Sequence, residues 1–306
     1  GWGLNEQGQK ISKRDLEKFT DATGYNRYDP YSLIQKFGAD GLRYWAASSQ
    51  LGNNLRFHER EVKDGRKIVI KLWNVARMAF GYMKDFDPAR DTVPYDQRPV
   101  EDQWILNELN AVVQKMTESF EGYDYATGKE VMHKFFWMNY CDDYLELVKS
   151  RFREGTKWSA QDQKAGQSTL YETLRTIIGL MAPYLPHITE EIYQKAECFN
   201  ETHPSLHVSP WPSVRSDVTF TRTAEMDLIL STLGQVRKLR SDRNIAGGAM
   251  LKELIVTPAD TLAPQAKKLE LSLLGAARAD NIVYLSTPPK NEAGLDIDIV
   301  TYEAQA

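Results

Sequence analysis

The stretch KIVIKLWNVARMAFGYM, residues 67–83, is the part of the sequence that decides the fold. Its apolar side chains recur at steps of three and four, as they do on one face of an α-helix: Ile68, Leu72, Val75, Ala79 and Met83. A helix with a single apolar stripe buries that stripe against a neighbour. The pattern therefore predicts a long amphipathic helix over about residues 61–85.

Three later segments carry the same spacing and are predicted as helices over about residues 101–120, 125–153 and 159–180. Their inward residues are, in order, Trp104, Leu109, Val112 and Met116; Trp137, Cys141, Tyr144 and Val148; Leu170, Leu174, Ile177 and Met181. Two prolines end the last of them, and a short helix is predicted over residues 188–198. Four long amphipathic helices in succession predict a helix bundle.

The pattern changes after the bundle. Residues 199–220 are rich in Pro, Ser and His and are predicted as a linker, and a helix is predicted over residues 222–243. Apolar residues then alternate, which predicts strands over residues 251–257, 282–285 and 295–300, with a helix over about residues 262–277 between the first two. The expected fold class is mainly α, a bundle followed by a small α/β unit. We expect domains over residues 1–60, 61–220 and 221–306.

Composition limits the classes of protein that the sequence can represent. Hydrophobic residues make up 42% and charged residues 26% of the 306 residues, which is typical of a globular chain and excludes intrinsic disorder. The net charge of −4 excludes a uniformly basic nucleic-acid binder, so any such partner must be held by local basic patches. The first residue is Gly1 rather than Met, from which we expect a fragment of a longer protein.

The two cysteines suggest a reduced, cytoplasmic protein without a structural metal. Cys141 and Cys198 are far apart in the sequence, as expected where disulfides do not form. Cys198 lies near His203 and His207 at a loosely metal-like spacing, but a fourth ligand is missing, so no metal site is predicted. The longest uncharged stretch is too short to span a membrane and contains prolines.

A glycine turn followed by two lysines begins the chain's functional motifs. In GQKISK, residues 8–13, Lys10 and Lys13 flank Ser12. Two ammonium groups and a hydroxyl on a mobile loop suit a polyphosphate, because they can approach it as charge builds up in a transition state. On these residues alone, an exposed lysine loop is the simpler interpretation.

Further motifs follow in a fixed order and favour the functional interpretation. They are KFGADGLR (36–43), GNNLRF (52–57), KLWNVAR (71–77), YCDDYLELVKSR (140–151), APYLPHITEEI (182–192), SPWP (209–212) and VRKLRSDRN (236–244). Together they resemble the C-terminal part of the class I aminoacyl-tRNA synthetases for branched aliphatic amino acids, and GQKISK is similar to the family's "KMSKS" loop. The resemblance covers almost the whole chain.

Within this family the valine enzymes are the most similar. Residues 140–151 are similar to their "CDWYLELVKPR" helix, and the chain lacks the cysteine-rich zinc ribbon expected of an isoleucine enzyme. Two alternatives stay open: a fragment of an isoleucine or leucine enzyme, and a stand-alone tRNA-binding or scaffold protein.

The resemblance implies a valine–tRNA ligase that uses ATP and Mg²⁺. Lys10, Ser12 and Lys13 would then contact the triphosphate of ATP. The chain lacks the "HIGH" motif and the Rossmann domain that build the adenylate, so we expect this part to be inactive alone. It departs from the family at Arg14, at Ile11 and in the long link over residues 15–28, which together leave the geometry of the loop open.

The resemblance also implies that the bundle binds the anticodon stem and loop of a valine tRNA, with the protein a monomer. A stripe on the first bundle helix suits RNA, since cations can meet phosphates and aromatic rings can stack on bases. The expected tRNA-binding residues are Arg66, Trp73, Asn74, Arg77 and Lys84 on this helix, Lys149 and Arg151 on the third, and Arg237 and Arg240 near residue 243. For the aromatic residues a place in the core is an equal alternative, and cations at a helix C-terminus also complement the macrodipole.

Overall fold

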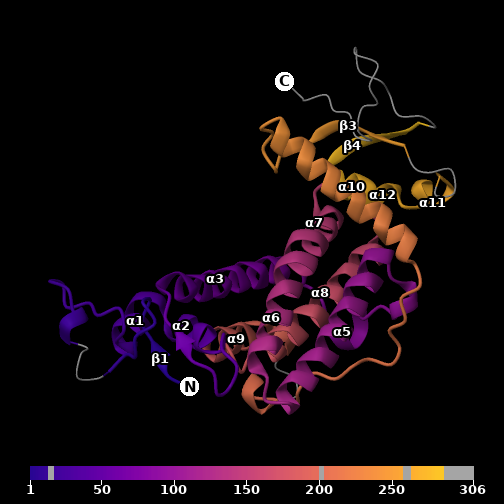
Figure 1. Ribbon diagram of the computed structural model, residues 1–306. Helices are drawn as coiled ribbons and strands as arrows, with labels where there is room; N and C mark the ends of the chain where they lie inside the picture. The colour runs from indigo at the N-terminus through magenta and orange to yellow at the C-terminus, as the bar shows by residue number, and fades with distance from the viewer. Residues whose placement is uncertain (13–16, 200–202, 258–262, 286–306) are drawn as a thin grey trace. The chain divides into compact units, whose positions relative to one another are not determined.

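The computed structural model describes residues 1–12, 17–199, 203–257 and 263–285 (Figure 1). It forms two compact units, each assembled from separate stretches of the chain. Unit 1 comprises Gly1–Arg90, Leu109–Phe136 and Leu170–Arg215, and unit 2 comprises Asp91–Glu108, Trp137–Thr169 and the described residues from Ser216 onward. The expected domain boundaries after residues 60 and 220 remain a prediction.

Unit 1 begins with short elements around a small core of their own. These elements are β1 (Gly3–Leu4), α1 (Pro30–Phe37), α2 (Ala39–Ala46) and β2 (Leu55–Arg56). The buried residues are Tyr28, Leu33, Phe37, Phe57 and Val62, and Ile11, Leu42 and Trp45 pack against them. The side chain of Asp29 caps α1 by accepting a 2.8 Å hydrogen bond from the backbone N–H of Ser32, and Gly38 ends the helix at φ +82°.

The helix predicted from the opening stretch is α3 (Glu59–Tyr82). All five residues of its predicted apolar face are buried, and α3 packs against α2 and against α9 (Pro186–Lys195). The axes of α2 and α3 come close because both carry a glycine at the crossing. A Cβ at Gly65 would lie 2.5 Å from the carbonyl oxygen of Gly41.

The other predicted bundle helices are present with small shifts in their ends. They are α5 (Val100–Glu121), the run α6 (Tyr125–Lys134), η3 (Phe135–Tyr144), α7 (Leu145–Val148) and η4 (Lys149–Phe152), and α8 (Ala160–Met181). The predicted inward residues of all three are buried, except Trp137, which is half-buried. Short turns complete this part: α4 (Pro88–Asp91), η2 (Tyr95–Gln97), η5 (Glu197–Phe199) and η6 (Leu206–Val208).

Two features of the bundle differ from the prediction. The segment η3 is a π-helix of 10 residues inside the third predicted helix, and π geometry often marks a functional region. The predicted linker packs on the bundle helices instead of running free. Its residue Trp211 donates an indole hydrogen bond of 2.9 Å to Thr117 on α5, and Asn110 on α5 pairs with the backbone of Arg215 through both amide atoms.

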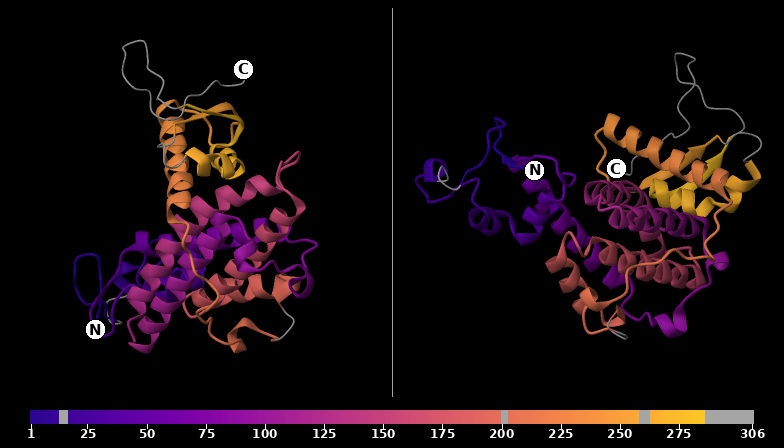
Figure 2. Two further views of the ribbon diagram at one scale, coloured as in Figure 1. Left: turned by 90° about the vertical axis from the view of Figure 1, so that its right-hand side faces the viewer. Right: turned by 60° about the horizontal axis from the view of Figure 1, so that its bottom comes forward.

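The C-terminal α/β segment of unit 2 comprises α10 (Thr223–Asp242), β3 (Leu251–Val256), α11 (Ala263–Lys268), α12 (Glu270–Ala277) and β4 (Ala279–Tyr284). The two strands are parallel, with Leu254 opposite Ile282, and α12 packs against both strands and α10 (Figures 1 and 2). Parallel strands need a crossover, which α11 and α12 supply in place of the single predicted helix. The strand predicted over residues 295–300 lies outside the described residues. Within the described part of the chain, no helix combines the length and the apolar composition that crossing a membrane requires.

Candidate nucleic-acid interface

The lysine motif lies on a tight turn at the start of unit 1. Asn5 is buried and holds the turn, because its side chain accepts hydrogen bonds from the backbone N–H groups of Gln7 (3.1 Å) and Gln9 (2.8 Å). Gly8 has φ +83°, a conformation that favours glycine. The turn exposes Lys10 and leaves Ser12 half-buried, while Lys13 and Arg14 lie outside the described residues.

The structure brings the lysine turn together with the motif GNNLRF. Strand β1 pairs with β2 in parallel, and Arg56 donates hydrogen bonds from its guanidinium to the carbonyl oxygen of Glu6, the one from Nε measuring 3.1 Å. Glu6 and Arg56 are 50 residues apart in the sequence, so their contact was not predicted. The hydrogen bonds from Arg56 to Glu6 therefore stabilise the turn that presents Lys10.

The long link after the lysine turn folds back on itself where it is described. Thr20 and Asn26 form an antiparallel bridge, and the carboxylate of Asp21 accepts hydrogen bonds from the backbone N–H groups of Thr23 (2.8 Å) and Tyr25 (3.1 Å). Hydrogen bonds from Thr23 lower the pKa of Asp21. The link ends at Tyr28, which is buried in the small core.

The predicted stripe on α3 is accessible to a partner. Four of its five residues are exposed: Arg66, Asn74, Arg77 and Lys84. The fifth, Trp73, is half-buried, so its side chain is only partly accessible to a base. Arg66 donates a 3.0 Å hydrogen bond to the carbonyl oxygen of Lys36 at the end of α1. Among the described residues, Arg77 and Lys84 make no ion pair and no side-chain hydrogen bond, which leaves both charges available to a polyanion.

A cleft of about 240 Å³ lies at the C-terminal end of this stripe. Phe80, Met83 and Phe86 supply apolar walls, and Lys84 together with Lys195 on α9 supplies cations. Aromatic surface beside two ammonium groups is the composition that suits an unstacked base and its phosphate. The sequence pattern included Lys84 but did not indicate Lys195, because α9 is more than a hundred residues away.

Arg151 must be corrected from an RNA-binding residue to a residue of the core. It is fully buried and forms ion pairs with two carboxylates of α5, Glu101 at 2.8 Å and Asp102. Tyr144 donates a 2.8 Å hydrogen bond to Asp102, and the hydroxyl of Ser272 on α12 donates to Glu101 at 3.1–3.2 Å. We call these five side chains the buried charge cluster. The side chain of Arg151 has no surface exposed to solvent, so it cannot contact a phosphate.

Arg240 must be corrected in the same way. Its guanidinium is largely buried and donates hydrogen bonds to three carbonyl oxygens, those of Ala246 (2.9 Å), Ala249 (2.8 Å) and Ala277 (3.1 Å). These bonds attach the turn before β3 and the end of α12 to α10. The residue therefore organises the C-terminal α/β segment.

The remaining predicted cations of unit 2 are paired with carboxylates. Lys149 and Arg278 both contact Glu146, and Arg237 forms a 2.8 Å ion pair with Asp143. Burial tends to raise the pKa of Glu146, but its bonds to Lys149 and Arg278 outweigh burial and lower it. Lys149 and Arg237 are partly exposed, so RNA contact by these two remains a prediction.

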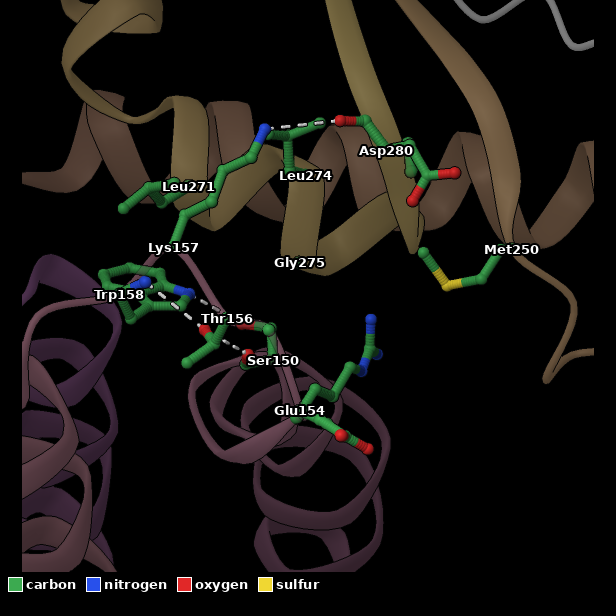
Figure 3. A pocket seen from close by; sticks show the side chains of 13 residues that line it. Ser150, Glu154, Thr156, Lys157, Trp158, Met250, Leu271, Leu274, Gly275 and Asp280 are labelled. Atoms are coloured by element: carbon green, nitrogen blue, oxygen red, sulfur yellow. Dashed lines mark hydrogen bonds between the residues drawn. The ribbon is translucent and has the colours of Figure 1, made fainter.

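A pocket of about 170 Å³ lies where η4 meets α12 and β4 (Figure 3). Trp158 donates an indole hydrogen bond of 3.0 Å to Ser150, and Lys157 donates one of 3.5 Å to the carbonyl oxygen of Asp280. Gly275 allows the close approach, because a Cβ there would lie 2.6 Å from the hydroxyl of Ser150. The residues at the end of this helix, Ser150 among them, thus line a pocket together with the C-terminal α/β segment.

The structure also brings together residues that the sequence did not connect. In a cavity of about 510 Å³ in unit 1, the half-buried Lys129 donates to the hydroxyl of Ser48 and to the carbonyl oxygen of Tyr44 (3.4 Å). A 2.8 Å hydrogen bond joins Tyr44 to His133, whose pKa is lowered mainly by burial. His133 thus has a structural partner. His187 lies at the start of α9, where the carboxylate of Asp40 accepts its backbone N–H at 3.2 Å.

Cys198 lines the cleft at the end of the stripe and is half-buried. Within the described residues, no three side chains of His, Cys, Asp or Glu lie together as metal ligands would.

Comparison with known proteins identifies the family. The family "Anticodon-binding domain of tRNA ligase" matches residues 102–255, which is about half of the chain. The valine–tRNA ligases of Wolbachia pipientis wMel (31% identical over 262 residues) and Rickettsia typhi (33% over 263 residues) each match 84% of the chain. The chain spans only 28% and 31% of the length of these relatives.

A solved structure has the same fold. It is the ternary complex of Agrobacterium radiobacter K84 LeuRS with tRNA and LeuAMS, which covers 93% of this chain and 32% of that one at a TM-score of 0.50. Its sequence is 16% identical, so the similarity concerns the fold alone. By its sequence match over half its length, the chain belongs to the family of anticodon-binding domains of tRNA ligases.

Proposed function

We propose that the chain is the anticodon-binding part of a valine–tRNA ligase and that it binds tRNA through the exposed stripe of α3. The observation that carries the proposal is a pair of exposed cations, Arg77 and Lys84, which make no ion pair and no side-chain hydrogen bond within the described residues. Lys84 also lines the cleft that Phe80 walls. Cations beside an aromatic wall provide phosphate contacts and base stacking on one surface. We choose valine as the amino acid because the relatives reported above are valine–tRNA ligases.

Local placement of charge matters for this proposal because the whole chain has a net charge of −4. In unit 2 the cations Arg151, Arg237 and Arg278 are used in ion pairs. In the predicted stripe, Arg77 and Lys84 make no ion pair within the part of the chain that the structure describes. One copy of the chain carries the complete stripe, so the proposal requires no second copy. The function implies a place in the cytoplasm, where tRNA serves protein synthesis.

In the whole enzyme, we propose that Lys10, Ser12 and Lys13 act on ATP. The valine carboxylate would attack the α-phosphate and pyrophosphate would leave. A hydroxyl at the 3′ end of the tRNA would then attack the carbonyl carbon of the adenylate and release AMP. The exposed position of Lys10 on a fixed turn suits contact with a triphosphate. Mg²⁺ would bind the phosphates and balance their charge, and no residue of this chain is assigned to it. The chain alone should not activate valine; pyrophosphate exchange above a Lys10→Met/Lys13→Met double variant would contradict this.

A binding experiment tests the proposed function. The chain is titrated with valine tRNA, with the same tRNA carrying an altered anticodon, and with isoleucine tRNA. Tighter binding of the unaltered valine tRNA is expected. Equal affinity for all three would contradict anticodon recognition and leave an RNA binder without specificity, while preference for isoleucine tRNA would reassign the amino acid.

A further inference from the structure

The ammonium group of Lys10 rests on an aromatic ring. Its Nζ lies 3.0 Å from the centroid of the Trp2 indole, within the range of a cation–π interaction. Trp2 is 53% exposed, and Lys10 is exposed as well. Cation–π contacts at exposed positions are weak, because water solvates the cation almost as well as the ring does.

Hydrogen bonds on both sides hold the backbone of Trp2 in place. The N–H of Trp2 donates a 2.9 Å hydrogen bond to the side chain of Asn54, and its carbonyl oxygen accepts one of 2.9 Å from Leu55. Lys10 is held by an antiparallel bridge to Leu4. The ring and the ammonium group therefore lie on adjacent backbones whose spacing is fixed by hydrogen bonds, and the contact between them is a property of the turn.

The indole is also the only partner of this ammonium group in the described part of the chain. Lys10 makes no ion pair and no side-chain hydrogen bond there, although Glu6 lies on the same turn. A charge that has only a π face as its partner is easily drawn to a polyanion, since contact with ionised phosphate is considerably stronger.

We propose that Trp2 is a positioning residue that holds the Lys10 ammonium group when no phosphate is bound and releases it to a polyphosphate chain. This rests on the proposal that Lys10 contacts the triphosphate of ATP. The contact stabilises the free state of the loop, so the free energy needed to break it on binding lowers the affinity of the wild type for polyphosphate. Trp2 thereby raises the concentration of polyphosphate at which the loop binds it.

The experiment uses inorganic tripolyphosphate and the chain as it stands, in buffer without Mg²⁺. Binding is measured by calorimetry for the wild type, Trp2→Ala, Lys10→Met and the double variant. Without the ring, Lys10 has no contact to give up, so Trp2→Ala is expected to bind about two- to five-fold more tightly. In the Lys10→Met background the same substitution should change nothing.

Tryptophan emission gives a second readout. The chain has 7 tryptophans, so the signal of Trp2 is taken as the difference between wild type and Trp2→Phe. When tripolyphosphate binds, the Trp2 emission of the wild type should become similar to the Trp2 emission of Lys10→Met, in which the ring has no ammonium partner. Weaker or unchanged binding by Trp2→Ala, or an equal effect of Trp2→Ala in both backgrounds, would overturn the proposal. Absence of any binding to the wild type would overturn it too, while tRNA binding through α3 is judged separately in the titrations above.

Discussion

The guanidinium of Arg151 lies 2.8 Å from the carboxylate of Glu101, measured from Nη2 to Oε1, and neither side chain is exposed to solvent. Asp102 forms the second ion pair of this guanidinium, so one buried cation serves two buried carboxylates. Buried ion pairs add little net stability, but removing one partner leaves an uncompensated charge in the core. The cluster is thus a point where unit 2 is sensitive to substitution.

Arg151→Met should destabilise the chain strongly. The substitution leaves Glu101 and Asp102 buried without a cation, and the free energy of unfolding should fall by about 3–5 kcal/mol. Urea unfolding followed by circular dichroism measures the loss. Lys67→Met is the matched control, because it removes one cation of the exposed pair with Asp64 and should leave the midpoint nearly unchanged. Equal effects of the two variants would contradict the assignment of Arg151 to the core.

Asp102 should make stability depend on pH in the acid range. Burial raises its pKa above the usual 3.8, against the opposing effect of Arg151. The folded chain then binds this proton more tightly than the unfolded chain, so the ionised carboxylate costs stability above the folded pKa, and the cost disappears as the pH falls toward 3.8. The free energy of unfolding of the wild type, relative to Asp102→Asn, should therefore rise as the pH falls through this range. Urea unfolding of both proteins at a series of pH values checks this, and a difference that is independent of pH would refute it.

The buried charge cluster also shows where prediction from the sequence ends. Leu72 and Leu174 were assigned to the core correctly, because helical periodicity is a local property and a stripe at steps of three and four is visible in one segment. The burial of Arg151 depends on Glu101, which lies 50 residues earlier, and on Ser272 in the C-terminal α/β segment. No local pattern contains that contact, so an arginine at a helix end looked like a solvated cation.

In the candidate site too, residues of one segment could be predicted and contacts between distant segments could not. The stripe could be listed in advance because all its members fall within one predicted helix, over about residues 61–85. The structure ends α3 at Tyr82, so Lys84 lies just past the helix, and both Arg77 and Lys84 are exposed as expected. Lys195, which completes the cleft, comes from α9 and required the packing of two distant helices. The contact between Lys10 and Trp2 required the bridge between Leu4 and Lys10, which no spacing rule indicates.

Gly65→Ala should destabilise unit 1, although alanine favours helices. A Cβ at this position would lie 2.5 Å from the carbonyl oxygen of Gly41, a backbone atom that cannot move aside without separating α2 from α3. Overpacking of this kind costs about 1–3 kcal/mol, which thermal or urea unfolding detects. Gly81→Ala on the same helix is the control, since nothing lies within 4 Å of its Cβ, and it should stabilise the chain by about 0.5–1 kcal/mol. Stabilisation by both variants would show that α2 and α3 are not in close contact.

Arg77→Gln should weaken tRNA binding and reduce its salt dependence. Each lost phosphate contact lowers the slope of log affinity against log salt by about 0.7–0.9. Filter binding or fluorescence titration at several salt concentrations measures the slope. Lys67→Gln is the control, because it removes one positive charge from the same helix outside the stripe, at a residue already paired with Asp64. A slope that stays the same in Arg77→Gln would remove this residue from the interface.

Arg240→Lys separates a structural role from contact with RNA, because it keeps the charge but removes the planar donor group. Lysine cannot donate simultaneously to Ala246, Ala249 and Ala277 in the geometry of the guanidinium. We therefore expect the turn before β3 to loosen, with faster hydrogen exchange at the amide of Leu251, which bonds to the carbonyl oxygen of Arg278. The salt slope of tRNA binding should stay that of the wild type. The neighbouring exposed cation Lys238 supplies the control, since Lys238→Met should leave exchange at Leu251 unchanged. If Arg240→Lys kept the exchange pattern and Arg240→Met lowered only the salt slope, Arg240 would belong to the RNA interface after all.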